Sequence, residues 1–202
     1  MKTQSEEYFR KSVDVIKTLY LDENISEIEF IKESLLKSIK QNKLIMIGGN
    51  GGSACDSDHF CSELVVRYKY NRKPVKCISL NSNTSILTAS ANDFGYEDSF
   101  KRVVECFGNK DDILLVLSTS GNSKNILSAL NYANSCGIKT IGLLGREGGL
   151  AKNLCKHSII IESKETALIQ QAHITILHYL AMEIELYIKN YWIFLKEKNN
   201  IL

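Results

Sequence analysis

Apolar residues recur at helical spacing over residues 4–41. Two runs carry this pattern, Val13–Tyr20 and Ile28–Ile39, and the polar stretch Asp22–Asn24 lies between them. The periodicity predicts two amphipathic helices, with a break at Asp22–Asn24. This part of the chain forms a helical N-terminal arm.

From residue 43 onwards, short apolar runs alternate with helical patterns. The strongest runs are Lys43–Gly48, Asp112–Leu117 and Ile138–Leu144, whose nearly continuous apolar character is typical of strands buried in a parallel sheet. Weaker strands are expected at Val75–Leu80 and Ser158–Ile161. Helical patterns follow at 82–91, 94–107, 124–136 and 165–189.

This alternation predicts a doubly wound parallel α/β sandwich with helices on both faces of the sheet. A chain of 202 residues with 44% hydrophobic composition fills one such domain. We therefore expect a single domain over residues 1–202, with the helical arm at 4–41, an α/β core at 43–190 and an aromatic, charged tail at 191–202.

Composition and charge exclude several classes of function. The net charge is only +2 and no basic stripe is present, so a nucleic-acid partner is not expected. The N-terminus is charged, without the apolar segment of a signal peptide, and no apolar run approaches the roughly 20 residues of a membrane span. These features predict a cytoplasmic protein without a membrane partner.

The six cysteines are scattered and form no C-x-x-C pair. They are expected to be small apolar residues in a reducing compartment. Cys61 is the exception worth following, because it stands two residues after His59.

Two loops follow predicted strands at the positions where such sheets bind ligands. The first contains Asn50, Gly51, Gly52 and Ser53, and its adjacent glycines let backbone N–H groups approach an anion at the start of a helix. The second, Ser118–Ser123, offers four hydroxyl groups and a glycine. An ordinary tight turn also explains Gly-Gly-Ser, but a turn does not need four hydroxyls in six positions.

Neither loop matches a nucleotide-binding motif, because the Walker A and G-x-G-x-x-G patterns are both absent. Hydroxyl groups and backbone amides can hold a phosphate monoester without a lysine. Together the two loops favour a sugar-phosphate ligand.

His59 and Glu63 are four residues apart in the helix that follows the first loop. This spacing places both side chains on one helix face, within reach of a single metal ion. The alternative is a solvated surface pair. The nearby loop and the apolar neighbours Phe60 and Leu64 favour the metal.

The serine-rich motif S-T-S-G-x-S after a strand resembles the signature of the sugar isomerase (SIS) domain, which binds phosphosugars. The combination of G-N-G-G-S with a downstream H-x-x-x-E resembles one branch, the sedoheptulose 7-phosphate isomerases (phosphoheptose isomerases). The run Thr166–Gln170, followed by a histidine eight residues after the glutamine, also matches this branch. The similarity extends over roughly residues 5 to 190.

The resemblance implies an active site. A zinc ion would be held by His59, Glu63, Gln170 and His178. Substrate contacts are implied for Asn50, Gly51, Gly52, Glu63, Asn92, Asp93, Ser118, Thr119, Ser120, Ser123 and Gln170, with Ser53 and Arg67 as further candidates. His173 also matches a family histidine, for which a packing role is expected.

One geometric point concerns the proposed metal ligands of the last helix. Gln170 and His178 are separated by about 12 Å along a straight helix and differ in direction by about 80°. If Gln170 and His178 bind the same metal ion, we expect either an irregular helix or a site assembled between subunits. The tetrameric assembly implied by the resemblance, with active sites at subunit interfaces, agrees with the second option.

The implied reaction is an aldose–ketose interconversion through an enediol, with Glu63 as the base and His178 as its partner acid. The product would be D-glycero-D-manno-heptose 7-phosphate, a precursor of the nucleotide-activated heptoses of lipopolysaccharide, capsule or other surface glycans.

The sequence departs from the family pattern at a few positions. Leu168 replaces a common arginine, Glu165 replaces an aspartate, and Cys61-Ser62 replaces a small apolar pair. None of these changes removes a proposed ligand. Two alternatives remain, a non-catalytic SIS regulator of the kind that binds the replication initiator, and an isomerase for another phosphosugar.

Overall fold

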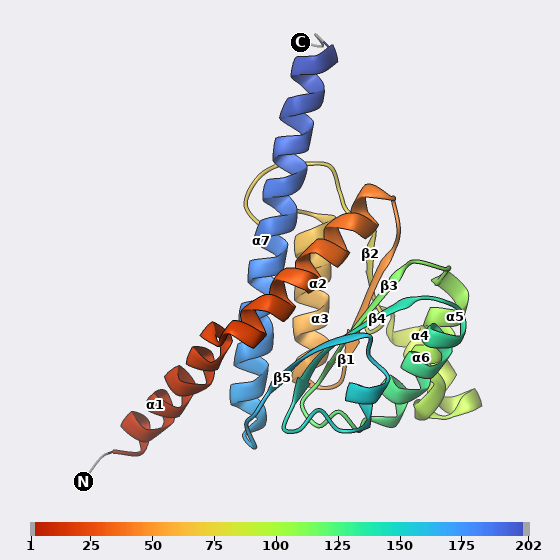
Figure 1. Cartoon of the computed structure of the whole chain (residues 1–202). Coiled ribbons are helices and arrows are strands. Elements are labelled where there is room, and N and C mark those ends of the chain that lie inside the picture. Colours follow the sequence, from red (N-terminus) through yellow and green to blue (C-terminus); the bar gives the residue numbers. More distant parts are fainter. Residues whose placement is uncertain (1–2, 200–202) are drawn as a thin grey trace.

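A five-stranded parallel sheet forms the centre of the molecule (Figure 1). The computed structural model describes the backbone of residues 3–199 and the side chains of residues 3–190. The strand order is β2-β1-β3-β4-β5, and every pairing is parallel. The strands are β1 (Ile45–Gly49), β2 (Cys77–Ser79), β3 (Ile113–Ser118), β4 (Lys139–Gly145) and β5 (His157–Ile161).

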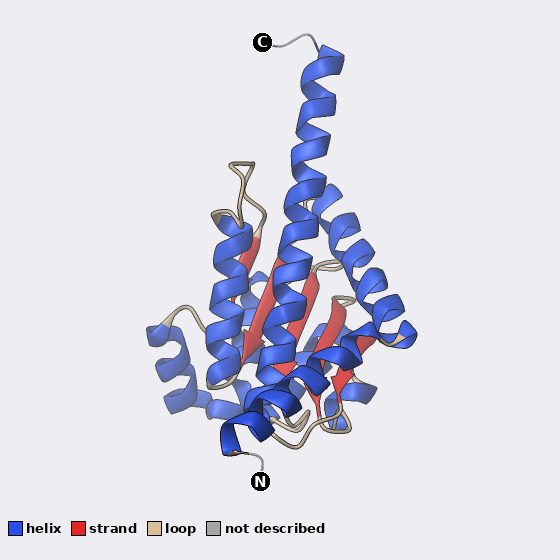
Figure 2. Ribbon diagram, turned by 90° about the vertical axis from the view of Figure 1, so that its left-hand side faces the viewer, coloured by secondary structure: helices blue, strands red, loops and turns tan. Residues whose placement is uncertain are grey.

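Helices cover both faces of the sheet, which confirms the doubly wound α/β fold (Figure 2). The α-helices are α1 (Gln4–Lys17), α2 (Asp22–Lys40), α3 (Gly52–Val65), α4 (Thr84–Phe94), α5 (Ser99–Phe107), α6 (Lys124–Ser135) and α7 (Thr166–Asn199). Short 3₁₀ turns occur at η1 (Thr18–Tyr20), η2 (Tyr96–Asp98) and η3 (Leu150–Asn153).

Alternate residues of each strand face opposite hydrophobic cores. In β3, Leu115 and Leu117 pack with the apolar faces of α2, α3 and α7. Leu114 and Val116 of the same strand pack with α5 and α6. All five residues Ile113–Leu117 are fully buried, because a parallel sheet covered on both faces leaves no solvent-facing side.

The helical arm breaks earlier than the sequence pattern predicted. The break at Asp22–Asn24 is wrong: the chain leaves the helix through Thr18–Tyr20, and Asp22 and Glu23 form the acidic first turn of α2. Acidic side chains are favourable at this position because they face the positive end of the helix dipole.

The last helix is longer than expected. We predicted a helix over 165–189 followed by a tail from 191, whereas α7 continues without interruption through Asn199. It lies against α3 on one face of the sheet (Figure 2). In the part of the chain that the structure describes, no helix has both the length and the apolar character needed to span a membrane.

Candidate active site

The two loops predicted to hold a phosphate lie side by side. They follow β1 and β3, which are neighbours in the sheet and pair up to Gly49 and Leu117. From β1 the chain continues to β2 on one side, and β3 then lies on the other side of β1, so the two strands form the topological switch point of the sheet. Open α/β sheets bind their ligands at such a point. The Asn50 amide exchanges hydrogen bonds of 2.9 and 3.0 Å with the amide of Asn125, in the helix after the second loop. The Tyr96 hydroxyl donates a further hydrogen bond of 2.7 Å to Asn50.

The glycines of the first loop have different roles. Gly51 has φ +59°, a left-handed conformation that favours glycine, and a Cβ at this position would meet open space. At Gly52 there is no room for a side chain, because an added Cβ would lie 2.6 Å from Nε2 of Gln170. The side-chain amide of Gln170 therefore lies directly against the first turn of α3.

The second loop uses some of its hydroxyl groups for its own structure. Ser118 is buried and its Oγ accepts a hydrogen bond of 3.0 Å from the backbone N–H of Gly121. Ser120 Oγ accepts the N–H of Asn122 at 3.2 Å. The hydroxyls of Thr119 and Ser123 have no hydrogen-bond partner among the described residues, and Ser123 does not cap the helix that it precedes. These two hydroxyls can both donate to and accept from a ligand, whereas those of Ser118 and Ser120 keep their O–H groups as donors.

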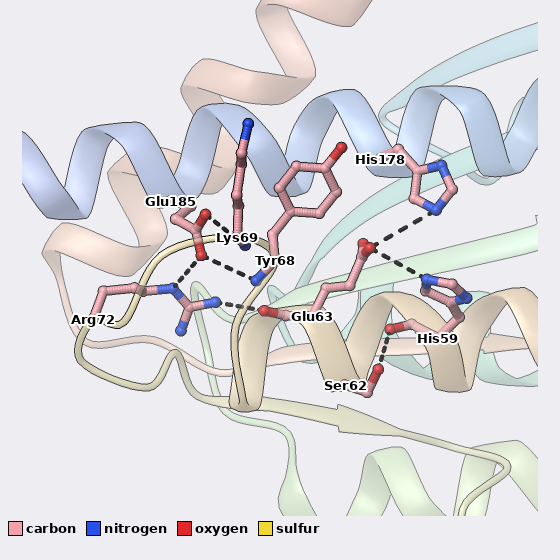
Figure 3. A network of polar contacts seen from close by, with 8 residues as sticks. All are labelled: His59, Ser62, Glu63, Tyr68, Lys69, Arg72, His178 and Glu185. Carbon is pink, nitrogen blue, oxygen red and sulfur yellow. Dashed lines mark hydrogen bonds and ion pairs between the residues drawn. The ribbon is translucent and has the colours of Figure 1, made fainter.

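His59 and Glu63 of α3 meet His178 of α7 in a single chain (Figure 3). Oε1 of Glu63 lies 3.2 Å from Nε2 of His59 and 3.7 Å from Nε2 of His178. Together these side chains offer three potential ligand atoms within 4.8 Å of one another. The Glu63 side chain is only 10% exposed, whereas those of His59 and His178 are 52% and 40% exposed.

The donor set suits a divalent metal ion. Two imidazole nitrogens and one carboxylate oxygen are ligands that zinc takes in catalytic sites. The other carboxylate oxygen of Glu63, Oε2, is buried and has no hydrogen-bond partner among the described residues. A buried carboxylate oxygen without a partner is costly, and a bound cation or a substrate hydroxyl would compensate for it.

Asp56 lies near this cluster and was not among the residues predicted from the sequence. It lies one helical turn before His59 in α3, and one of its carboxylate oxygens is buried without a partner among the described residues. Burial raises the pKa of Asp56, while the nearby His59 and His178 act in the opposite direction. Asp56, His59 and Glu63 stand at i, i+3 and i+7, a spacing that places all three on one helix face. This spacing could have identified Asp56 from the sequence.

Other predicted site residues lie outside this cluster. Asn92 and Asp93 are exposed at the end of α4, where the amide of Asn92 donates to Asp93 at 2.8 Å. Tyr96, three residues further on, keeps this end of α4 beside the first loop through its hydrogen bond to Asn50. Arg67 is exposed just after α3. Substrate contacts of these residues stay predictions.

The positions of Gln170 and His178 follow from the packing of α7 against α3. Gln170 lies at the start of α3, at Gly52, and His178 lies further along, at His59 and Glu63. The two helices therefore run in the same direction, and the eight-residue spacing in α7 matches the distance along α3. Three of the four proposed ligands meet without a partner subunit or an irregular helix. Coordination by Gln170 stays a prediction.

Comparison with known proteins identifies the family of this chain. The sequence pattern of the SIS domain matches residues 7–145. A phosphoheptose isomerase of Helicobacter pylori strain P12 is 48% identical over 160 residues, which is 78% of this chain and 83% of the relative. The chain belongs to the phosphoheptose isomerases. A family member from Clostridium acetobutylicum is 40% identical over 186 residues, 92% of this chain and 95% of its own.

A solved phosphoheptose isomerase structure shares the whole fold. The enzyme from Francisella tularensis superposes with a TM-score of 0.85 at 31% identity, over 90% of this chain and 96% of that one. This phosphoheptose isomerase chain thus has the SIS fold over 90% of its length, which extends past the 7–145 match.

Proposed function

We propose that this phosphoheptose isomerase converts sedoheptulose 7-phosphate into D-glycero-D-manno-heptose 7-phosphate. The convergence of His59, Glu63 and His178 beside Asp56 carries the proposal. Asp56, His59 and Glu63 belong to α3, whose first turn follows the glycine loop, and His178 joins them from α7. A sugar phosphate fits such a site with its phosphate on the two loops and its carbonyl end at the cluster.

The two oxygens of Glu63 support its role as the base. Oε1 faces the two histidines, whereas Oε2 has no partner among the described residues and can accept a proton from the carbon next to the substrate carbonyl. His178 donates a proton to the carbonyl oxygen as the enediol forms. In the second half, the proton on Glu63 returns to the neighbouring carbon, and His178 recovers a proton from the other hydroxyl.

We further propose zinc as the bound metal, held by His59, Glu63 and His178 with Gln170 as the fourth ligand. When bound, it would polarise the substrate oxygens on which negative charge develops. The donor set supports this choice, because Oε1 of Glu63 faces the nitrogens of both histidines. The remaining substrate contacts are proposed for the two loops and for Arg67, Asn92 and Asp93.

The proposal includes a cytoplasmic homotetramer that supplies heptose for surface glycans. Exposed apolar side chains along α1 and the start of α2 support the assembly: Tyr8, Phe9, Val13, Tyr20, Leu21 and Ile25. A hollow of about 270 Å³ between this arm and α7 adds to the same apolar face. A second copy of the chain would remove this surface from water.

The names of the relatives argue against the non-catalytic regulator, because they denote enzymes. An isomerase for another phosphosugar is separated by turnover assays on sedoheptulose 7-phosphate and on hexose and pentose phosphates. We expect the heptose substrate to give the highest kcat/KM. Higher kcat/KM on a shorter sugar would contradict the proposed substrate.

Glu63→Gln tests the base in the same assay. We expect kcat to fall by about 100-fold or more, since the amide cannot accept the proton. Glu105→Gln is a matched control, because Glu105 is half-buried on α5 and pairs with Arg102 at 2.9 Å. Near-normal turnover by Glu63→Gln would remove Glu63 from its role.

A further inference from the structure

Glu185 is a buried carboxylate on α7, seven residues after His178 and therefore on nearly the same helix face. Its two oxygens accept three successive backbone N–H groups, from Tyr68 at 3.0 Å and from Lys69 and Tyr70 at 2.8 Å each. These donors belong to the segment 66–72 after α3, which forms neither helix nor strand. Glu185 therefore fastens this segment to α7.

Arg72 extends the contact from Glu185 to the residue that carries the proposed base. Its Nε lies 3.8 Å from Oε1 of Glu185, and both side chains are 2% exposed. The guanidinium donates hydrogen bonds to the backbone carbonyls of Glu63 and Leu64. Carbonyls in the last turn of a helix lack partners within the helix. Arg72 thus caps α3 at Glu63.

Tyr68 reaches the other member of the catalytic pair. Its backbone N–H is held by Glu185, and its ring centroid lies 6.3 Å from that of His178 at 44° (Figure 3). One buried carboxylate thus connects the backbone of Glu63, through Arg72, and the aromatic neighbour of His178, through Tyr68.

We propose that Glu185 is a positioning residue for proton transfer: acting through Arg72 and Tyr68, it fixes Glu63 and His178 relative to each other. The inference rests on the proposed roles of these two residues. Proton transfer is sensitive to displacements of less than about 1 Å, so loosening this arrangement lowers kcat. The hydrogen bonds of Glu185 do not reach the two phosphate loops or Arg67, the proposed substrate contact at the start of segment 66–72, so KM should rise less than kcat falls.

The first test compares two tyrosines of the same segment. Tyr68 and Tyr70 are 38% and 39% exposed, so both alanine variants are expected to fold. Tyr68→Ala removes the ring beside His178 and should lower kcat by about 10-fold, with KM within about twofold. Tyr70→Ala is the matched control, because its ring instead lies under Nζ of Lys189, at 4.0 Å. It should leave both constants nearly unchanged.

The second test compares two buried carboxylates. Glu185→Gln removes the charge that holds segment 66–72. Asp112→Asn is the control, because Asp112 is 4% exposed and accepts the N–H groups of Leu44 and Asn109. Both variants should lower the melting temperature, but only Glu185→Gln should lower kcat, by about 10- to 100-fold. Arg72→Lys keeps the positive charge but loses the paired hydrogen bonds of the guanidinium. Its kcat should lie between those of Glu185→Gln and Asp112→Asn.

Several results would overturn the inference. One is an unchanged kcat in a folded Glu185→Gln variant. Another is an equal loss of kcat in the two carboxylate variants or in the two tyrosine variants. A third is a rise in KM without a fall in kcat in Glu185→Gln or Tyr68→Ala. Turnover of sedoheptulose 7-phosphate by the unmodified protein is measured first. Its absence would contradict the proposed function, whereas an active parent with a fully active Glu185→Gln contradicts only the positioning role.

Discussion

Burial distinguishes two kinds of histidine in α7. His173 is fully buried, and burial lowers its pKa to about 4. His178, five residues further on, keeps 40% of its side chain exposed and faces Glu63. The packing role expected for His173 is confirmed by its burial. A neutral buried histidine links the stability of the fold to pH.

We expect this link to weaken the fold in mild acid. Below pH about 6.5 the unfolded chain binds a proton at His173 that the folded chain binds only near pH 4. Stability is therefore fully present above pH 6.5 and declines as the pH falls towards 4, by up to about 3 kcal/mol. His173→Leu should remove this part of the decline. Urea unfolding at pH 7.5 and pH 5 measures the difference, and equal pH dependence in the two proteins would contradict it.

At the scale of elements, apolar runs predicted the strands closely. The run Asp112–Leu117 became β3 (Ile113–Ser118), and Lys43–Gly48 became β1 (Ile45–Gly49). Fully buried parallel strands are the elements that hydrophobic runs identify best. The loops at their carboxyl ends could be located for the same reason, because they follow directly from the strands.

Contacts between distant helices could not be derived from residue patterns. His178 was named only because the chain resembles a known family, since nothing in its local sequence shows that it faces α3. The sequence pattern did not identify Glu185 or Arg72, because an isolated glutamate or arginine is normally expected on the protein surface. Only the folded chain shows that both side chains are 2% exposed. Their role depends on packing between segments more than 100 residues apart.

The close approach of α3 and α7 at Gly52 gives a prediction at this scale. A methyl group in Gly52→Ala would lie 2.6 Å from Nε2 of Gln170, so the glutamine must move away from the first loop. We expect kcat/KM to fall by about 10-fold with little loss of stability, because the Gln170 side chain can rotate. Steady-state kinetics and thermal melting measure the two effects.

Gly51→Ala is the contrasting variant. A Cβ added here meets open space, but the backbone, at φ +59° and ψ −124°, is unfavourable for alanine by about 1–3 kcal/mol. Gly51→Ala should therefore lower the melting temperature more than Gly52→Ala. If Gly52→Ala keeps full kcat/KM, Gln170 does not contribute to the reaction from this position.

At the scale of the whole molecule, helix α1 is poorly covered by the rest of the chain. Helix α1 extends away from the sheet (Figure 1). It contacts α7 through the Ser12–Gln171 hydrogen bond, and Lys11 bonds Glu165, the residue just before α7. Phe9 and Val13 are 65% and 51% exposed and lie four residues apart, so they share one face of α1. Apolar faces of this kind are typical of surfaces that another protein subunit covers.

The double variant Phe9→Glu, Val13→Glu tests whether this face joins subunits. Both side chains are exposed in the single chain, so the variant should fold, while four buried carboxylates at each two-fold contact would oppose assembly. Light scattering after size exclusion should show a tetramer for the parent and a smaller species for the variant. Phe107→Glu, at a 45% exposed position on α5, should remain tetrameric. If the active sites need a neighbouring subunit, turnover falls with the assembly. A smaller species with full turnover would show that the chain which brings together His59, Glu63 and His178 works alone, and an unchanged tetramer would place the contact on another face.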